Sequence, residues 1–301
     1  MNKYSFCSLS YILALLVQTQ WLWADEIAVV DDTGRTVRLS APAMRLVSLS
    51  PHITELLFTL GLGDRIVGTV RFSDFPESAA SIQRLGDAFT VNIEMLIQLE
   101  PDLVIAWRSG GSGRTIRKIE SLGVPVYFNE ANSLEGIGVS AARIATLAGI
   151  KEAGADIAEQ HMRKLRRIRE QHESEPKVKI FYQISDLNLY TVNRHHLIGE
   201  AIAICGGDNI FANSMIKVPQ VGIEAVISAG PDLIVYSSGG ESDADDHWTS
   251  RWRPFRSIPA VANGHLYRLS ADIITRPSFR MVSGIEKLCE FINLARLRGN
   301  Q

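Results

Sequence analysis

The stretch NIEMLIQLEPDLVIAWR at residues 92–108 reappears in diverged form as GIEAVISAGPDLIVYSS at residues 222–238. The two stretches align without a gap, so Glu94 pairs with Glu224, and each copy runs from a Pro-Asp into an apolar strand. Self-similarity at a fixed distance indicates an internal duplication, and this distance is the size of a lobe, too long for a solenoid repeat. The sequence therefore predicts two similar lobes, each displaying a glutamate at an equivalent place. Such a molecule is suited to grip a ligand between its lobes and to dock on a two-fold symmetric partner.

Strands and helices alternate around both copies. The first half predicts strands at residues 45–49, 65–69, 103–107 and 124–128, with helices at 53–60, 92–99 and 116–122. The second half predicts strands at residues 179–184, 233–236 and 264–269, with helices at 196–205, 224–228 and 277–297. This alternation predicts parallel sheets covered on both faces. The expected fold class is α/β: two Rossmann-like lobes with central parallel sheets, joined by one long rigid helix.

The joining helix is expected at residues 151–173, which contain no proline and place apolar residues on one face. At 1.5 Å per residue it would be about 30 Å long, enough to cross between lobes. Its basic residues have no aromatics among them, so we interpret them as a solvated helix face. The net charge of −2 likewise favours no nucleic-acid partner. The expected boundaries are a signal peptide at 1–24, an N-terminal lobe at 25–148, the linking helix at 149–175 and a C-terminal lobe at 176–301.

The N-terminus predicts export. Lys3 is the only charged residue before Asp25, and the apolar run at residues 11–17 is shorter than the roughly 20 residues that span a bilayer. We interpret this segment as a secretory signal cleaved after Ala24, with a retained membrane anchor as the alternative. The mature chain then keeps Cys205 and Cys289, and an even cysteine count in an exported protein favours a disulfide over two buried thiols.

Motifs of catalysis are weak in this sequence. The glycine-rich residues 109–114 lack the Lys-Ser/Thr of a phosphate loop, and no G-x-S-x-G elbow occurs. His52 and Glu55 have a spacing that can bind a metal, but a helix-start histidine and a surface glutamate are the alternative interpretation. The acidic residues 243–247 offer oxygen ligands without an EF-hand pattern, so a solvated loop is favoured. We expect no catalytic residue, no metal site and no cofactor.

Aromatic and polar residues follow several of the expected strands. Phe72, Phe89 and Trp107 come after strands of the first lobe, and Asp272 and Arg276 come after the last strand of the second. In open α/β sheets ligands bind beyond the carboxyl ends of the strands. Flat aromatics at that edge suit a broad apolar ligand, and a few polar groups would orient it. The alternative is that Trp107 is an ordinary core residue.

With these landmarks the chain resembles the periplasmic binding proteins of ABC importers for cobalamin, haem and iron-siderophores. The resemblance covers nearly all of the mature chain and includes both Pro-Asp-Leu repeats. Its other landmarks are DTGR at residues 32–35, VSLSP at 47–51 with TEL at 54–56, and FSDFP at 72–76. The resemblance implies two lobes joined by a rigid helix, and a ligand held between them.

Within that superfamily the chain is most similar to the cobalamin-binding members, through residues 92–108, CGGDNIF at 205–211 and VPQV at 218–221. The resemblance implies that Trp107 is a pocket tryptophan, that Phe72 replaces a pocket tyrosine and that Asp272 and Arg276 keep polar positions. It also implies the disulfide between Cys205 and Cys289. Two further pocket tryptophans are replaced here by Ala88, with Phe89 beside it, and by Val218.

We therefore expect an exported, monomeric receptor that captures a corrinoid and delivers it to the permease dimer of an inner-membrane ABC importer. Glu94 and Glu224 are expected to dock on that dimer, although acids in the first turn of a helix are also favoured by the helix dipole. A haem or ferric-siderophore receptor is the first alternative. The lack of a tyrosine near Asp87 counts against haem. A periplasmic metal-dependent enzyme is the second alternative.

Overall fold

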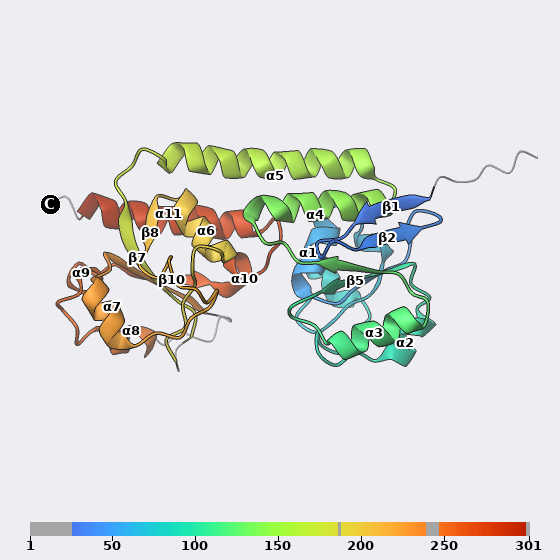
Figure 1. The fold of residues 1–301 in the computed structure, drawn as a ribbon, viewed down its shortest axis with the longest axis horizontal. Helices are drawn as coiled ribbons and strands as arrows, with labels where there is room; N and C mark the ends of the chain where they lie inside the picture. The colour runs from blue at the N-terminus through green and yellow to red at the C-terminus, as the bar shows by residue number, and fades with distance from the viewer. Residues whose placement is uncertain (1–25, 186–187, 239–246, 299–301) are drawn as a thin grey trace, which may run out of the picture.

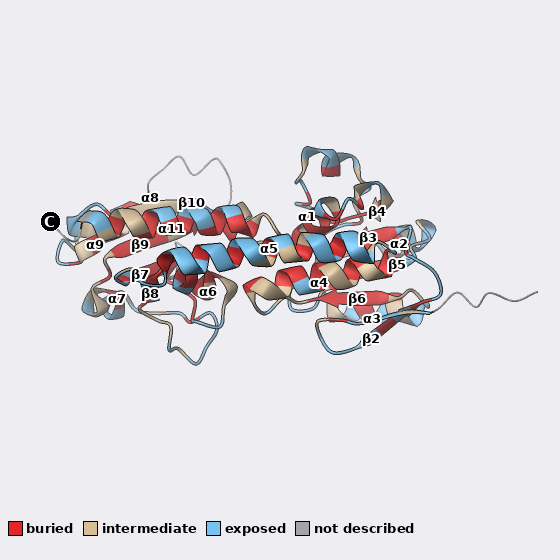
Figure 2. Cartoon of the chain, turned by 90° about the horizontal axis from the view of Figure 1, so that it is seen from above, coloured by how far each residue is buried: buried red, intermediate tan, exposed pale blue. Residues whose placement is uncertain are grey.

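The computed structural model describes residues 26–185, 188–238 and 247–298. Two α/β lobes lie side by side, and the helix α5 (Lys151–His172) runs across both of them (Figure 1). The sequence predicted this helix to within a residue. Figure 2 shows from above how α5 spans the two lobes, with buried and exposed residues alternating along it. The expected architecture of two lobes on parallel sheets is confirmed.

Each lobe contains a four-stranded parallel sheet with the same strand order. The first sheet has the order β4-β3-β5-β6, and the second, read from its other edge, has the order β8-β7-β9-β10. The shared topology bears out the duplication, since β5 and β9 are the strands that follow the two Pro-Asp pairs. The strands of the first sheet are β3 (Leu46–Ser48), β4 (Ile66–Gly68), β5 (Leu103–Trp107) and β6 (Val126–Asn129). Those of the second are β7 (Val178–Gln183), β8 (Gly207–Asn209), β9 (Leu233–Ser238) and β10 (Leu266–Ser270).

The repeated aspartates tie neighbouring strands together at the amino ends of the sheets. Asp102 Oδ2 accepts hydrogen bonds from the backbone N–H groups of Met44 and Arg45, each at 2.8 Å. Asp232 Oδ2 accepts the N–H of Lys179 at 3.0 Å. In both lobes the aspartate thus holds the backbone at the start of the adjacent strand. The conserved part of the repeat is a structural clamp at the edge opposite to the one where ligands bind.

Helices cover both sheets, and an antiparallel hairpin of β1 (Ile27–Val30) and β2 (Thr36–Leu39) lies beside the first. The first lobe contains α1 (Pro51–Thr59), α2 (Ile93–Gln98), α3 (Gly113–Ser121) and α4 (Leu134–Leu147), with 3₁₀ turns at Gly63–Arg65 and Glu77–Ser81. The second contains α6 (Leu197–Ile204), α7 (Ile223–Ala229), α8 (His247–Trp252), α9 (Pro259–Ala262), α10 (Ala271–Ile274) and α11 (Met281–Arg298). The sequence did not indicate β8, α8, α9 or α10, because each is too short to show a period.

One buried apolar cluster extends through both lobes. It contains Leu103 of β5, Leu134 of α4, Leu165 of α5 and Leu233 of β9, all without solvent exposure. The predicted disulfide is present within it. Cys205 at the end of α6 is bonded to Cys289 of α11 and closes a loop of 84 residues. In the described part of the chain, no helix is both long and apolar enough to cross a membrane.

Candidate ligand-binding site

Trp107 is the last residue of β5 and is half-buried where the strand leaves the sheet. Its indole meets the His52 ring edge-on, with centroids 5.4 Å apart and planes at 88°. Gly110 lies against the indole so closely that a Cβ there would be 1.8 Å from the ring atom Cε3. Only glycine therefore fits at residue 110 without moving the ring. These contacts fix Trp107 and leave only part of its surface for a ligand.

Phe72 and Phe89 are the most exposed aromatic rings of the first lobe, at 66% and 69%. Phe89 stands on a turn held by Asp87, whose Oδ1 accepts the N–H groups of Phe89 at 2.9 Å and Thr90 at 2.8 Å. These hydrogen bonds lower the pKa of Asp87. The Ala88 carbonyl accepts the N–H of Ser112 at 3.3 Å, which ties the turn to the loop that follows Trp107. Phe89 thus stands in solvent next to the loop that follows β5, and Phe72 stands in solvent after β4.

An ionic cluster joins the two lobes beside these aromatics. Arg276, just after α10 of the second lobe, contacts carboxylates of Glu55 at 3.0 Å, Asp74 at 3.0 Å and Asp272 at 2.8 Å. Glu55 and Asp74 belong to the first lobe. The Arg276 side chain is 15% exposed and Asp272 is 45% exposed. Asp272 and Arg276, which the sequence placed near each other, therefore form an ion pair. The Asp272 side chain is the more exposed of the two.

Glu55 is the centre of this cluster. Its carboxylate accepts the hydroxyl of Ser278 at 2.5 Å and lies 3.4 Å from the Arg280 guanidinium, which also stacks over the Phe75 ring at 3.9 Å. Glu55 is only 3% exposed, so its interpretation as a surface glutamate was wrong. A buried carboxylate needs such partners, because leaving it unpaired would cost several kcal/mol. The signal in the sequence was an acid directly beside the apolar run at residues 56–58 of the helix.

His52 does not pair with Glu55 as a metal site. Its Nδ1 lies 2.8 Å from Ser50 Oγ and its Nε2 lies 2.9 Å from Asn129 Oδ1, so both ring nitrogens are occupied. Burial lowers its pKa to about 4, which keeps the ring neutral. Within residues 26–185, 188–238 and 247–298, no group of three or more potential metal ligands occurs. The acidic residues 243–246 lie outside the described residues.

The second lobe presents an apolar loop between β8 and α7. Met215 is fully exposed, Ile216 is 64% exposed and Val218 is 38% exposed. Lys217, in the same loop, lines a hollow together with Asn132 of the first lobe, so the loop faces across to that lobe. Neighbouring exposed apolar side chains make this loop a candidate binding surface. The sequence drew attention to Val218 alone, since isolated apolar residues in a loop show no pattern.

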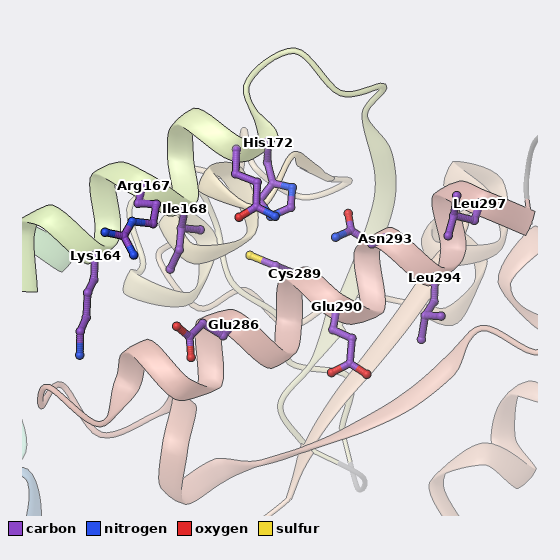
Figure 3. A pocket seen from close by; sticks show the side chains of 11 residues that line it. Lys164, Arg167, Ile168, His172, Glu286, Cys289, Glu290, Asn293, Leu294 and Leu297 are labelled. Atoms are coloured by element: carbon purple, nitrogen blue, oxygen red, sulfur yellow. The ribbon is translucent and has the colours of Figure 1, made fainter.

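Two further hollows lie away from the strand ends. One of about 580 Å³ lies between α4 and α5, and one of about 470 Å³ lies between α5 and α11. Figure 3 shows the side chains of α5 and α11 that line the latter, with the disulfide-bonded Cys289 among them. Neither is at the carboxyl edge of a sheet, where ligands of open α/β sheets bind.

Glu94 and Glu224 are each the second residue of their helices, α2 and α7, and both are exposed. Among the described residues neither carboxylate has an ion-pair partner. Both helices lie on the lower side of their lobes in Figure 1, opposite α5. The two glutamates thus occupy equivalent positions in the two lobes.

Comparison with known proteins places this geometry in a family. A family model described as a periplasmic binding protein matches residues 46–273. The vitamin B12-binding protein of Vibrio campbellii is 34% identical over 257 residues, which are 85% of this chain and 92% of that protein. The vitamin B12-binding protein BtuF of Vibrio cholerae superposes with a TM-score of 0.74 at 32% identity, covering 84% of this chain and 98% of the other.

The heme-binding protein RhuT of Roseiflexus also superposes with a TM-score of 0.74, covering 84% of this chain and 99% of its own. Its identity is 23%, so this likeness shows the fold alone. The sequence relatives are named as binding proteins, and the matching family model is that of a periplasmic binding protein. The match over most of the chain, the shared strand order of the two lobes and the single helix that crosses them agree. This chain belongs to the periplasmic binding protein family.

Proposed function

We propose that this protein captures cobalamin or a related corrinoid between its lobes and delivers it to an inner-membrane ABC importer. The main support is the pair of exposed rings, Phe72 and Phe89, at the carboxyl edge of the first sheet. An apolar loop of the second lobe faces that lobe. The printed names of the sequence relatives, which bind vitamin B12, agree with an apolar site of this kind.

The corrin ring fits this surface by its chemistry. It has a broad apolar face and amide arms at its edge. Phenylalanine rings bury a large apolar area and have few rotamers to lose. The half-exposed carboxylate of Asp272 can accept hydrogen bonds from amide arms, while Arg276 holds that carboxylate in place at 2.8 Å. Binding and release need no covalent chemistry.

Glu94 and Glu224 would dock on the importer. Because the two lobes share one topology, their glutamates are related by a pseudo-two-fold axis, and a permease dimer offers two equivalent sockets. Arginine is the natural partner for each carboxylate, since it binds with two parallel hydrogen bonds. The receptor acts as a monomer in the periplasm after its signal peptide is removed behind Ala24.

Calorimetry with cyanocobalamin, cobinamide, haemin and a ferric siderophore tests the ligand. We expect both corrinoids to bind. Replacing Phe72 and Phe89 by alanine should weaken corrinoid binding by about 1–3 kcal/mol, because each ring loses apolar burial against the ligand. Trp107→Ala should cost a similar amount.

Leu297→Ala is the matched control, since Leu297 is 69% exposed and lies at the far end of α11. It should leave corrinoid affinity unchanged. Binding of haemin or the siderophore, with neither corrinoid bound, would transfer the proposal to the first alternative while keeping the two-lobed receptor.

A further inference from the structure

We infer that a hollow between the lobes, lined by Arg194, His195 and Lys217, binds the phosphodiester in the nucleotide loop of the corrinoid. This inference rests on the proposed function and names a subsite within it. The hollow has a volume of about 470 Å³. Asn132 and Ser133 line it from the first lobe, and Glu200 completes the lining from the second.

The three basic side chains have unused hydrogen-bonding capacity. Arg194 donates from Nε to the Ala212 carbonyl at 3.2 Å, which leaves its two terminal nitrogens available. Arg194, His195 and Lys217 are all exposed. In the part of the chain that the structure describes, none of the three forms an ion pair. Unpaired bases around one hollow are the arrangement that recognises an anion.

The backbone holds these bases on one side of the hollow. The N–H of Asn193 donates to the Lys217 carbonyl at 3.0 Å, and the N–H of Arg194 donates to the Ala212 carbonyl at 3.1 Å. His195 is fixed by its N–H, which donates to Asn193 Oδ1 at 2.9 Å. The segments before α6 and before α7 are therefore joined, so the site is built before any ligand arrives.

Arg276 cannot take this role. It already contacts the carboxylates of Glu55, Asp74 and Asp272, and among the described residues Arg280 adds the second positive charge of that cluster. The cluster as a whole carries one more negative than positive charge. A phosphodiester placed there would be repelled and would have to break an existing ion pair, whereas the basic hollow offers free donors.

Glu200 is the acidic group among the residues that line the hollow, and its average negative charge is reduced. Its carboxylate accepts the N–H of Leu134 at 2.8 Å and lies next to Glu135, which pairs with Arg169 at 2.8 Å. Burial, and then the neighbouring Glu135, raise the pKa of Glu200 to about 7. Close to neutral pH this carboxyl is therefore partly protonated, which leaves the hollow positive.

The test compares three ligands: cyanocobalamin, cobinamide phosphate, which retains a phosphate without ribose and base, and cobinamide, which lacks all three. Kd is measured by calorimetry for the parent protein and for Arg194→Gln with Lys217→Gln. The double variant should lose roughly 10- to 100-fold in affinity for the two phosphate-bearing ligands, the range for hydrogen bonds to a charged group. Its affinity for cobinamide should stay within about threefold of the parent.

Lys118→Gln with Arg163→Gln is the charge-matched control, because both side chains are exposed and lie outside the hollow. It should not discriminate among the ligands. Thermal unfolding of each variant shows that the fold is kept. If the double variant loses the same affinity for all three ligands, or loses none for any of them, the inference is overturned. The proposed function still stands in that case, provided that the parent protein binds the corrinoids. If the parent protein binds no corrinoid, the phosphodiester subsite and the proposed function are both refuted.

Discussion

The buried carboxylate of Glu55 allows a sharp test of how the two lobes are held together. In Glu55→Gln the side chain keeps its shape but loses its charge. Ser278 keeps an acceptor at its 2.5 Å contact, while the contacts to Arg276 at 3.0 Å and Arg280 at 3.4 Å lose their electrostatic attraction. Arg276 retains Asp74 and Asp272, so it is not left unpaired.

The cost follows from these contacts. Removing one partner of a buried ion pair typically costs about 3–5 kcal/mol when the other charge is orphaned. Here the guanidinium keeps two carboxylates, so we expect about 2–3 kcal/mol. For a chain of this size that loss lowers Tm by about 4–10 °C. Calorimetric unfolding of the parent and the variant measures this shift directly.

The loss should also loosen the lobes relative to each other, because this cluster joins residues 221 positions apart in the chain. Small-angle X-ray scattering of the variant should then report a larger radius of gyration. Glu94→Gln is the control, an exposed glutamate that should change Tm by less than about 1 °C. An unchanged Tm in Glu55→Gln would show that the cluster contributes nothing to holding the lobes.

Three further predictions follow from other parts of the molecule. Thiol labelling of the denatured, non-reduced protein should find neither Cys205 nor Cys289 reactive, and two reactive thiols would contradict the disulfide. Replacing both cysteines by alanine should lower the free energy of unfolding by about 4 kcal/mol, because the bond closes a loop of 84 residues. Alanine at both Glu94 and Glu224 should abolish importer-dependent uptake and leave ligand affinity unchanged, so normal uptake would remove their docking role. Burial raises the pKa of Glu200 from 4.5 to about 7, so ionising it costs stability as pH rises through that range. At pH 8, Glu200→Gln should therefore have a Tm roughly 2–4 °C above that of the parent, after allowance for solvent screening. Near pH 4.5 the two proteins should have the same Tm. An equal Tm at pH 8 would refute the raised pKa of Glu200.

Much of the fold could be predicted because its signals are local. The long helix showed as a proline-free amphipathic run, and β5 and β9 showed as apolar runs after Pro-Asp. Periodicity is a property of neighbouring residues, so long elements are visible in the sequence. Short elements such as β8 and α10 were missed because the three residues of β8 show only two alternations and the four residues of α10 make barely more than one helical turn.

The candidate site, like the fold, could be predicted only in part from the sequence. The aromatics at Phe72, Phe89 and Trp107 could be placed from the sequence, since the end of a parallel strand is where a ligand meets an open sheet. The exposure of each ring could not be predicted, and Trp107 is more enclosed than the other two because Gly110 and His52 pack against it.

By itself, the sequence determined the duplication, the alternation of strands and helices that repeats with it and the pairing of Cys205 with Cys289, and it predicted the sheet edge at which a ligand would bind. Only the tertiary structure decided that Glu55 is a buried partner of Arg276 and that Arg194 and Lys217 line one hollow with Asn132. The physical reason is that charge pairing depends on distance in space. Glu55 and Arg276 are more than 200 positions apart in the chain, and they meet only because the two lobes pack around one core.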